Sequence, residues 1–224
     1  MGTYRKSVMT SGLAALFLLS ALDGLSAANL SYNAVLPVYL KLNKYLVPEE
    51  FVDSYMKTYR SEIWERYKDD EFELDAKRQE SFALMKDWIA SADTAEQFTI
   101  ETSMDFGEYD FNSQKFSFTP LRDGTYFSVK QSGWTDFPSE IKVFFENSSE
   151  IDGISMEKEK AKAFINSLRD DSGYVRRDLK AKITFHLTDV RAVGEVVASI
   201  RSLELFHKYS GELVSGINLD KVPN

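Results

Sequence analysis

Apolar residues recur every three or four positions between residues 48 and 67, which is the spacing of one face of an α-helix. Charged side chains occupy the opposite face, so the pattern predicts an amphipathic helix. Pro48-Glu49-Glu50 favours a helix start, because proline suits the first turn and the helix dipole favours anions there. The acidic break at Asp69-Asp70-Glu71 predicts its end. The apolar positions are Phe51, Val52, Tyr55, Met56, Tyr59, Ile63 and Tyr67.

Two further helices are predicted beside this one. Apolar side chains after the acidic break, at Phe72, Phe82, Met85 and Ile89, indicate a helix that closes near Asp93. An upstream segment, residues 36–46, is a shorter candidate. Pro37 interrupts it, because proline lacks the N–H that a helix interior needs. The chain up to residue 93 is therefore predicted to be mainly helical.

From Phe98 the period of the apolar positions changes to two, which is typical of a strand with one buried and one solvated face. Residues 115–121 and 125–130 also have strand character. They flank Asp123-Gly124, a strong turn signal, so they are predicted to pair as a hairpin. The alternating apolar positions of the first strand are Phe98, Ile100, Thr102, Met104 and Phe106.

The rest of the chain continues this sheet with one helix inserted. Residues 141–145 and 179–187 are predicted strands, and residues 157–168 are a predicted helix. Residues 196–206 are predicted as a strand because they are rich in branched side chains, with a helix as the alternative. Together these elements predict an α+β fold in which N-terminal helices (residues 29–93) pack on a mainly antiparallel sheet (residues 94–224) with one inserted helix.

The N-terminal segment has the three parts of a secretory signal peptide. Arg5 and Lys6 supply the positive start, residues 13–22 form the apolar run, and Ser26 and Ala28 offer the small side chains that signal peptidase requires. The alternative is an uncleaved anchor, but the apolar run has about half of the roughly 20 residues that span a bilayer. The pattern therefore predicts cleavage after Ala28.

Removal of residues 1–28 as a signal peptide would leave residues 29–224 as a single domain, periplasmic or extracellular. No cysteine follows the cleavage point, so the mature chain cannot carry a bacterial lipoprotein anchor, and we expect no stable membrane insertion. The net charge of −8 becomes −9, because the signal peptide contains Arg5, Lys6 and Asp23. This negative balance argues against nucleic acid as a partner.

The composition and the missing motifs exclude several classes of chemistry. The absence of cysteine removes thiol nucleophiles, thiolate zinc sites and disulfides, so packing of the 16 Phe, 11 Tyr and 3 Trp residues must hold the fold. The chain also lacks a serine flanked by glycines two residues away on either side, the paired-histidine zinc motif and a Gly-rich phosphate loop. The sequence therefore predicts no cofactor and no metal, and it identifies no catalytic residue.

The two histidines are predicted to be structural. His186 lies on a predicted strand, on the same face as Lys180, Lys182 and Thr184, and that face is expected to be solvated. His207 follows an apolar pair at the end of the last long strand, with no second histidine nearby in the sequence. Neither has a visible partner for acid–base or metal chemistry.

Carboxylates gather at two places where they invite a functional interpretation. Asp105, Glu108 and Asp110 border a turn, where they could face a cleft or bind calcium, although solvated side chains are the favoured interpretation. Residues 148–159 partly match a calcium loop. Ser155 explains the same stretch more simply, as the N-cap of the following helix.

The connection spanning residues 131–138 is the strongest candidate for a binding loop. It combines Trp134, Asp136 and Phe137 with a glycine and a proline, and loops on a rigid sheet often carry function. The aromatic pair could stack on a sugar ring or anchor a partner protein. The alternative is that Trp134 folds back over the sheet as part of the core.

A set of aromatic motifs resembles a known family. Glu108-Tyr109-Asp110-Phe111 is followed by Phe116-Ser117-Phe118, and the helix at residues 161–168 leads to Arg176 and Ile183-Thr184-Phe185. This arrangement is similar to a family of secreted Gram-negative proteins known only as a domain of unknown function. The resemblance implies an envelope location and one compact domain, and it assigns no catalytic or binding residue.

Three functional hypotheses follow from these observations. The first is a non-catalytic periplasmic or secreted binding module that recognises a protein or a glycan. The second is a hydrolase of envelope polymers that uses a carboxylate pair, with Asp105 and Asp110 as the candidates. The third is an acidic inhibitor or immunity protein that neutralises a basic enzyme.

Overall fold

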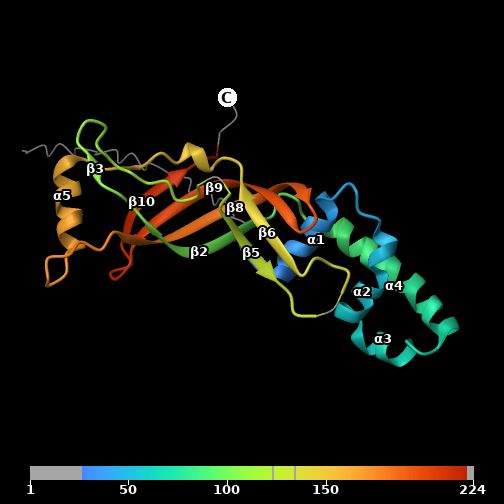
Figure 1. Cartoon of the computed structure of the whole chain (residues 1–224). Coiled ribbons are helices and arrows are strands. Elements are labelled where there is room, and N and C mark those ends of the chain that lie inside the picture. The colour runs from blue at the N-terminus through green and yellow to red at the C-terminus, as the bar shows by residue number, and fades with distance from the viewer. Residues whose placement is uncertain (1–26, 123, 134, 221–224) are drawn as a thin grey trace, which may run out of the picture.

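The computed structural model describes residues 27–122, 124–133 and 135–220. Within them, five α-helices accompany a mostly antiparallel sheet, which confirms the predicted α+β fold class. The sheet forms the middle of an elongated molecule (Figure 1). Helices α2, α3 and α4 extend from one end of the sheet, and α5 lies at the other end beside strand β3.

The first helix covers the sheet, and four further helical segments follow it. Six of the eleven residues of α1 are buried, and the helix contacts β6 and β8. Pro37 lies inside α1 without ending it. The segments are α1 (Tyr32–Leu42), the 3-10 helix η1 (Pro48–Phe51), α2 (Val52–Tyr59), α3 (Ser61–Tyr67) and α4 (Glu71–Ser91). We call residues 48–91 the helical arm.

The helical arm confirms the predicted starts at Pro48 and after the acidic break, but the single helix expected through residue 67 is wrong. Arg60 has φ −133° and ψ 40°, so the chain turns there and divides the expected helix into α2 and α3. Its guanidinium donates to Ser81 Oγ at 2.7 Å and to Glu80 Oε1 at 2.5 Å, both on α4. Asp70 caps α4 by accepting hydrogen bonds from the backbone N–H groups of the first turn.

The large sheet has the strand order β1-β2-β8-β9-β6-β5. On the edge of β9 that faces away from β8, β6 pairs with the first part of the strand and β10 pairs with the last part. Most pairs are antiparallel, while β1–β2 and β6–β9 are parallel. The strands are β1 (Ala28–Asn29), β2 (Gln97–Asp105), β5 (Tyr126–Lys130), β6 (Glu140–Phe145), β8 (Asp178–Ala192), β9 (Glu195–His207) and β10 (Leu213–Asn218). The strand predicted at residues 196–206 is therefore confirmed over the helix alternative. Strand β10 was not predicted.

A separate three-stranded sheet overturns the hairpin predicted at Asp123-Gly124. It contains β3 (Tyr109–Asp110), β4 (Lys115–Phe116) and β7 (Ile154–Ser155). Strand β4 pairs with β3 and β7, whereas β5 pairs with β6, so the two predicted hairpin arms belong to different sheets. The segment between them crosses the core instead, because Phe118 and Leu121 are buried there. Asp123 itself lies outside the described residues.

The inserted helix α5 (Lys158–Ser167) is found where it was predicted, but its predicted cap is wrong. Ser155 pairs with Lys115 in β7, so it belongs to a strand. The residue at the N-cap is Glu157, and its side chain makes no capping hydrogen bond. Ser155 is therefore a strand residue of the three-stranded sheet and does not cap α5.

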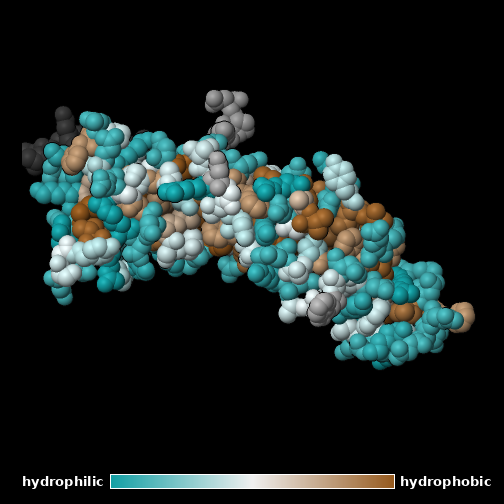
Figure 2. Space-filling model, in the orientation of Figure 1, coloured by the Kyte–Doolittle hydropathy of each residue, from teal (hydrophilic) through white to brown (hydrophobic). Residues whose placement is uncertain are grey.

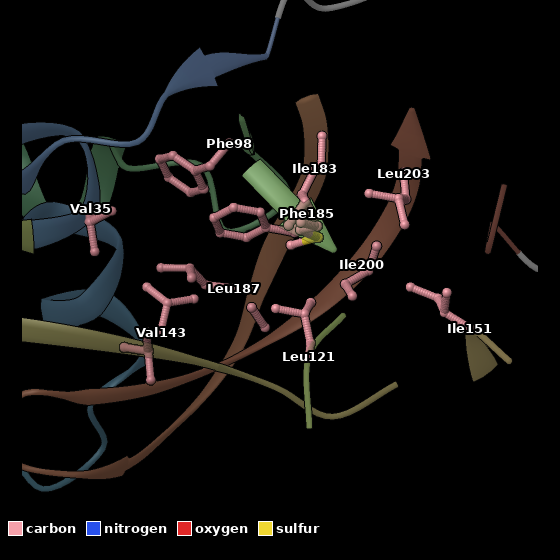
Figure 3. Close-up of a cluster of buried hydrophobic side chains, with 14 of the residues drawn as sticks. Val35, Phe98, Leu121, Val143, Ile151, Ile183, Phe185, Leu187, Ile200 and Leu203 are labelled. Carbon is pink, nitrogen blue, oxygen red and sulfur yellow. The ribbon is translucent and has the colours of Figure 1, made fainter. Parts of the chain in front are cut away.

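The core is built on the two longest strands. Alternate residues of β8, from Leu179 to Leu187, are buried under α1 and the flanking strands, as the period-two pattern predicted. Figure 3 shows Ile183 and Phe185 of β8 gathered with Phe98 of β2 and Val35 of α1. The rings of Phe98 and Phe185 lie 6.0 Å apart between centroids.

A β-bulge keeps the second long strand in phase with this core. The buried positions of β9 are Val196, Ala198 and Ile200, and then Leu203 and Leu205. Between Ile200 and Leu203 the buried positions change from even-numbered to odd-numbered residues. The pairing register with β8 shifts at the same place, between Thr184 and Phe185. Because one extra residue re-aims every later side chain, the bulge lets β9 present apolar residues inward along its whole length.

The described chain begins at residue 27, next to the predicted cleavage point. The cleavage predicted after Ala28 falls within β1, where Ala28 pairs with Phe98 and Asn29 pairs with Thr99. A chain that begins at Asn29 keeps the second pair and the Leu30 N–H to Thr99 C=O hydrogen bond of 2.9 Å. No helix from residue 27 to residue 220, with positions 123 and 134 left aside, is long and apolar enough to cross a membrane.

The turn between β8 and β9 provides a direct test of this fold. Gly194 has φ +70°, and an added Cβ would lie 2.6 Å from the carbonyl oxygen of Glu140. Gly211 has a similar φ of +73°, with nothing within 4 Å of an added Cβ.

Gly211→Ala should therefore cost about 1 kcal/mol of stability, for the left-handed backbone alone. Gly194→Ala should cost about 2–4 kcal/mol, because the contact adds to that strain. Urea unfolding of both variants measures the difference, and equal losses would show that the turn is not tightly packed on β6.

Candidate functional site

The predicted binding loop, residues 131–138, lies where the sheet meets the helical arm. Phe137 is only 2% exposed, and its ring stacks on Phe51 of η1 with centroids 5.5 Å apart and an interplanar angle of 12°. This side chain holds the loop against the arm and presents no ring to solvent. Trp134 lies outside the described residues.

A pair of hydrogen bonds fixes the same loop to α2. Ser54 is fully buried, and its hydroxyl donates to a carboxylate oxygen of Asp136 at 2.8 Å. The backbone N–H of Asp136 donates back to the Ser54 hydroxyl at 2.7 Å. The carboxylate of Asp136 nevertheless belongs to an exposed residue, so its second oxygen remains available to a ligand.

A cavity of about 380 Å³ opens beside this loop, and we call it the joint cleft. Its walls come from the end of α1, the connection to η1, the binding loop and the β8–β9 turn. It is large enough for a small ligand, since such sites begin at about 300 Å³. The lining residues are Tyr39, Asn43, Tyr45, Leu46, Val47, Glu50, Phe51, Asp136, Pro138, Val190, Arg191, Ala192 and Val193.

One wall of the joint cleft is held by an amide and a buried phenol. The Asn43 side-chain amide donates to the Tyr39 hydroxyl at 3.3 Å, and its oxygen accepts from the Tyr45 backbone N–H at 3.1 Å. The backbone N–H of Gly194 also donates to the Tyr39 hydroxyl, at 3.3 Å. These bonds join α1 to the β8–β9 turn and position Tyr45, whose ring is 93% exposed.

Two carboxylates stand between the joint cleft and a neighbouring cavity of about 390 Å³. Glu50 and Asp136 line both spaces. The guanidinium that lines the second cavity, Arg78, is engaged by both oxygens of Asp53 at 2.7 and 2.8 Å. That bidentate pair holds the pKa of Asp53 below its usual range. In the described chain the Glu50 side chain has no ion pair or hydrogen bond, so its oxygens are free to accept from a ligand.

The two histidines lie at separate places on the β8–β9 hairpin. His186 pairs with Ser199, and its Nδ1 accepts from the Arg201 guanidinium at 3.1 Å. Burial lowers the pKa of His186, and the positive charge of Arg201 lowers it further. His207 pairs with Leu179 at the far end of the hairpin. The structure therefore does not bring the histidines together.

The acidic turn does not assemble a carboxylate pair on one cavity. Asp105 lines a space of about 570 Å³ beside β2, and Asp110 is not among the residues that line it. Asp110 instead accepts from the Asn112 backbone N–H at 2.8 Å and the Ser113 hydroxyl at 2.9 Å, which keep its pKa low. These contacts are those of a solvated turn.

The calcium-like segment is committed to other contacts as well. Asp152 forms an ion pair with Lys115 at 2.7 Å, which lowers the pKa of its carboxyl group. Over the stretches of the chain that the structure describes, no group of three or more histidine, aspartate or glutamate side chains could hold a metal ion.

Residues that sequence reasoning did not select form most of the joint cleft. Tyr45 stands in a polar turn without a periodic partner, and Glu50 was interpreted only as a helix-start residue. One signal in the sequence could have pointed to Tyr45 as a binding residue. It is an aromatic side chain shortly before Pro48, and proline restricts the backbone that follows the turn. That signal becomes meaningful only when the β8–β9 turn is known to lie opposite.

Comparison with protein families gives one match. Residues 48–167, more than half of the chain, match a family described as Domain of unknown function (DUF4852). The chain belongs to the DUF4852 family. Comparisons with curated proteins and with solved structures give no match. The resemblance to a family of unknown function is thus confirmed, while its secreted Gram-negative character stays a prediction.

The DUF4852 match covers only part of the structural unit. It begins with η1 and ends with the last residue of α5, so it includes the helical arm, β2 to β7 and α5. It stops before β8 and β9, although β2 pairs with β8 over nine residues and β6 pairs with β9. The matched segment therefore depends on strands outside it for its hydrogen-bonded partners.

Proposed function

We propose that this DUF4852 protein is an exported, non-catalytic binding module that holds a glycan segment in the joint cleft. The observation that carries the proposal is the combination of an exposed aromatic ring with two carboxylates that have oxygens left to accept from a ligand, all around one cavity. Tyr45 supplies the ring, and Glu50 and Asp136 supply the acceptors. Sugars offer apolar C–H faces that stack on rings and hydroxyl groups that donate to carboxylates.

The rigidity of the walls supports a binding role. Phe137 stacks on Phe51, and Asp136 exchanges two hydrogen bonds with Ser54, so the loop is held in place before a ligand arrives. Prior ordering of a site reduces the entropy lost on binding. Trp134 stays a candidate second stacking ring on the strength of the sequence alone.

Export remains part of the proposal on the strength of the N-terminal sequence. Arg5 and Lys6, the apolar run and the small side chains at Ser26 and Ala28 form a complete secretion signal. Envelope compartments also contain the glycans that such a module would meet.

The glycan proposal can be tested by calorimetric titration with cellotriose and tri-N-acetylchitotriose. We expect at least one of these saccharides to bind, and Tyr45→Ala to weaken binding about five- to tenfold through loss of the stacking surface. Glu50→Gln and Trp134→Ala should each weaken it as well. Tyr174→Ala is the matched control, because Tyr174 is also exposed but lies outside the cleft.

These variants are expected to fold normally, since Tyr45 and Tyr174 are exposed and the Glu50 side chain forms no hydrogen bond or ion pair with a described residue. Binding that is unchanged in both Tyr45→Ala and Glu50→Gln would remove the joint cleft as the site. Failure of both saccharides to bind the unaltered protein would contradict the glycan as the ligand.

The export proposal has its own measurement. Mass spectrometry of the protein recovered from a secreting host should find Asn29 at its N-terminus, because signal peptidase cuts after small residues such as Ala28. An exported protein that still carries Met1 would contradict the cleaved signal.

A further inference from the structure

Another cavity lies at the opposite end of the molecule from the helical arm, between α5 and the three-stranded sheet. It has a volume of about 310 Å³. Figure 1 shows α5 and β3 together at this end, and Figure 2 shows apolar surface beside α5 with hydrophilic side chains around it. The lining residues are Tyr109, Phe111, Phe116, Lys158, Ala161, Lys162, Ile165, Asn166 and Arg169. We call this the α5 cavity.

The inner surface of the α5 cavity is apolar and rigid. Phe116 and Ala161 are buried at its base, where Phe116 packs edge-on against Tyr109 with centroids 5.0 Å apart. The Tyr109 hydroxyl donates to the Met156 carbonyl at 2.7 Å, so this ring cannot swing away without losing that bond. The base is therefore preformed for an apolar group.

The mouth of the α5 cavity carries an exposed aromatic ring. Phe111 is 69% exposed and packs edge-on against Tyr109, with centroids 5.2 Å apart. Phe111 and the buried Phe116 line the same cavity, so both its mouth and its base offer apolar surface to a ligand. A ligand that enters the cavity would cover Phe111.

Three cations border the cavity, and none of the described residues that line it is a carboxylate. Lys158 and Lys162 are four residues apart, so they occupy the same face of α5, and Arg169 follows the helix. Lys158 lies 6.0 Å from the centre of the Phe111 ring. In the described ranges, none of the three side chains forms an ion pair, and the Arg169 guanidinium donates only to the Gly173 carbonyl, at 2.9 Å. This positive rim stands out on a chain with a net charge of −8.

We propose that the α5 cavity binds a small amphiphilic anion, a molecule with one carboxylate or phosphate head group and a short alkyl tail. The apolar base takes the tail, Phe111 closes over it, and Lys158 with Lys162 holds the head group at the rim. Charge complementarity selects an anion, because three unpaired cations without a facing carboxylate attract negative charge. The small, concave volume selects a single short molecule over a bilayer surface.

Calorimetric titration of the full chain with sodium octanoate tests this proposal. We expect one molecule to bind per chain. Octanol, which has the same tail without the charge, should bind about tenfold more weakly, and acetate should not bind. The double variant Lys158→Gln with Lys162→Gln should weaken octanoate about tenfold. Lys160→Gln is the matched control, because Lys160 lies on α5 but does not line the cavity.

Three results would overturn the proposal. The first is the absence of saturable octanoate binding to the unaltered protein, and the second is an equal loss of affinity in Lys160→Gln and in the double variant. The third is binding to phosphatidylglycerol vesicles without binding of free octanoate, which would assign the positive rim to a membrane surface. The comparison of octanoate with octanol on the unaltered protein decides the role of charge even if the double variant is unstable.

Discussion

The pairing of β8 with β9 is the interaction on which the rest of the structure depends. The two strands are paired from Leu179–His207 at one end to Ala192–Glu195 at the other. Strand β2 pairs with the outer edge of β8, and β6 and β10 divide the outer edge of β9. The turn at Gly194 is bonded to Tyr39 of α1 and to the Lys142 backbone of β6, so the same hairpin also fixes the first helix. The wall of the joint cleft is therefore attached to this hairpin.

The two cavities use this scaffold differently. The joint cleft lies at the Gly194 end of the hairpin, where the helical arm contributes Glu50 and the sheet contributes Asp136, both acidic. The α5 cavity lies near the other end and is bordered by cations, among them Lys158 and Lys162. The two cavities share no lining residue, so two chemically different ligands could occupy them at the same time.

The sequence predicted those elements whose side-chain pattern is set by their immediate neighbours. The alternation in β8 and the start of η1 at Pro48 were visible because burial and helix-end preferences act locally. The break at Arg60 was not visible, since it depends on Ser81 and Glu80 of another helix. The Asp-Gly signal at Gly124 was misleading because the flanking strands found partners elsewhere.

Phe137 was expected at a surface, but its stacking on Phe51 requires the docked arm. Both cavities escaped prediction because their walls come from segments distant in sequence.

Hydrogen–deuterium exchange of the native protein, followed by mass spectrometry, tests the central role of the β8–β9 hairpin most directly. Amides shared between β8 and β9 should exchange slowest, at the rate set by global unfolding, because every neighbouring strand must separate before they open. The helical arm has its own small core of Val52, Met56, Leu74 and Met85, so its amides should exchange faster and as a group. Slower exchange in α4 than in β8 and β9 would contradict the hairpin as the element that holds the fold.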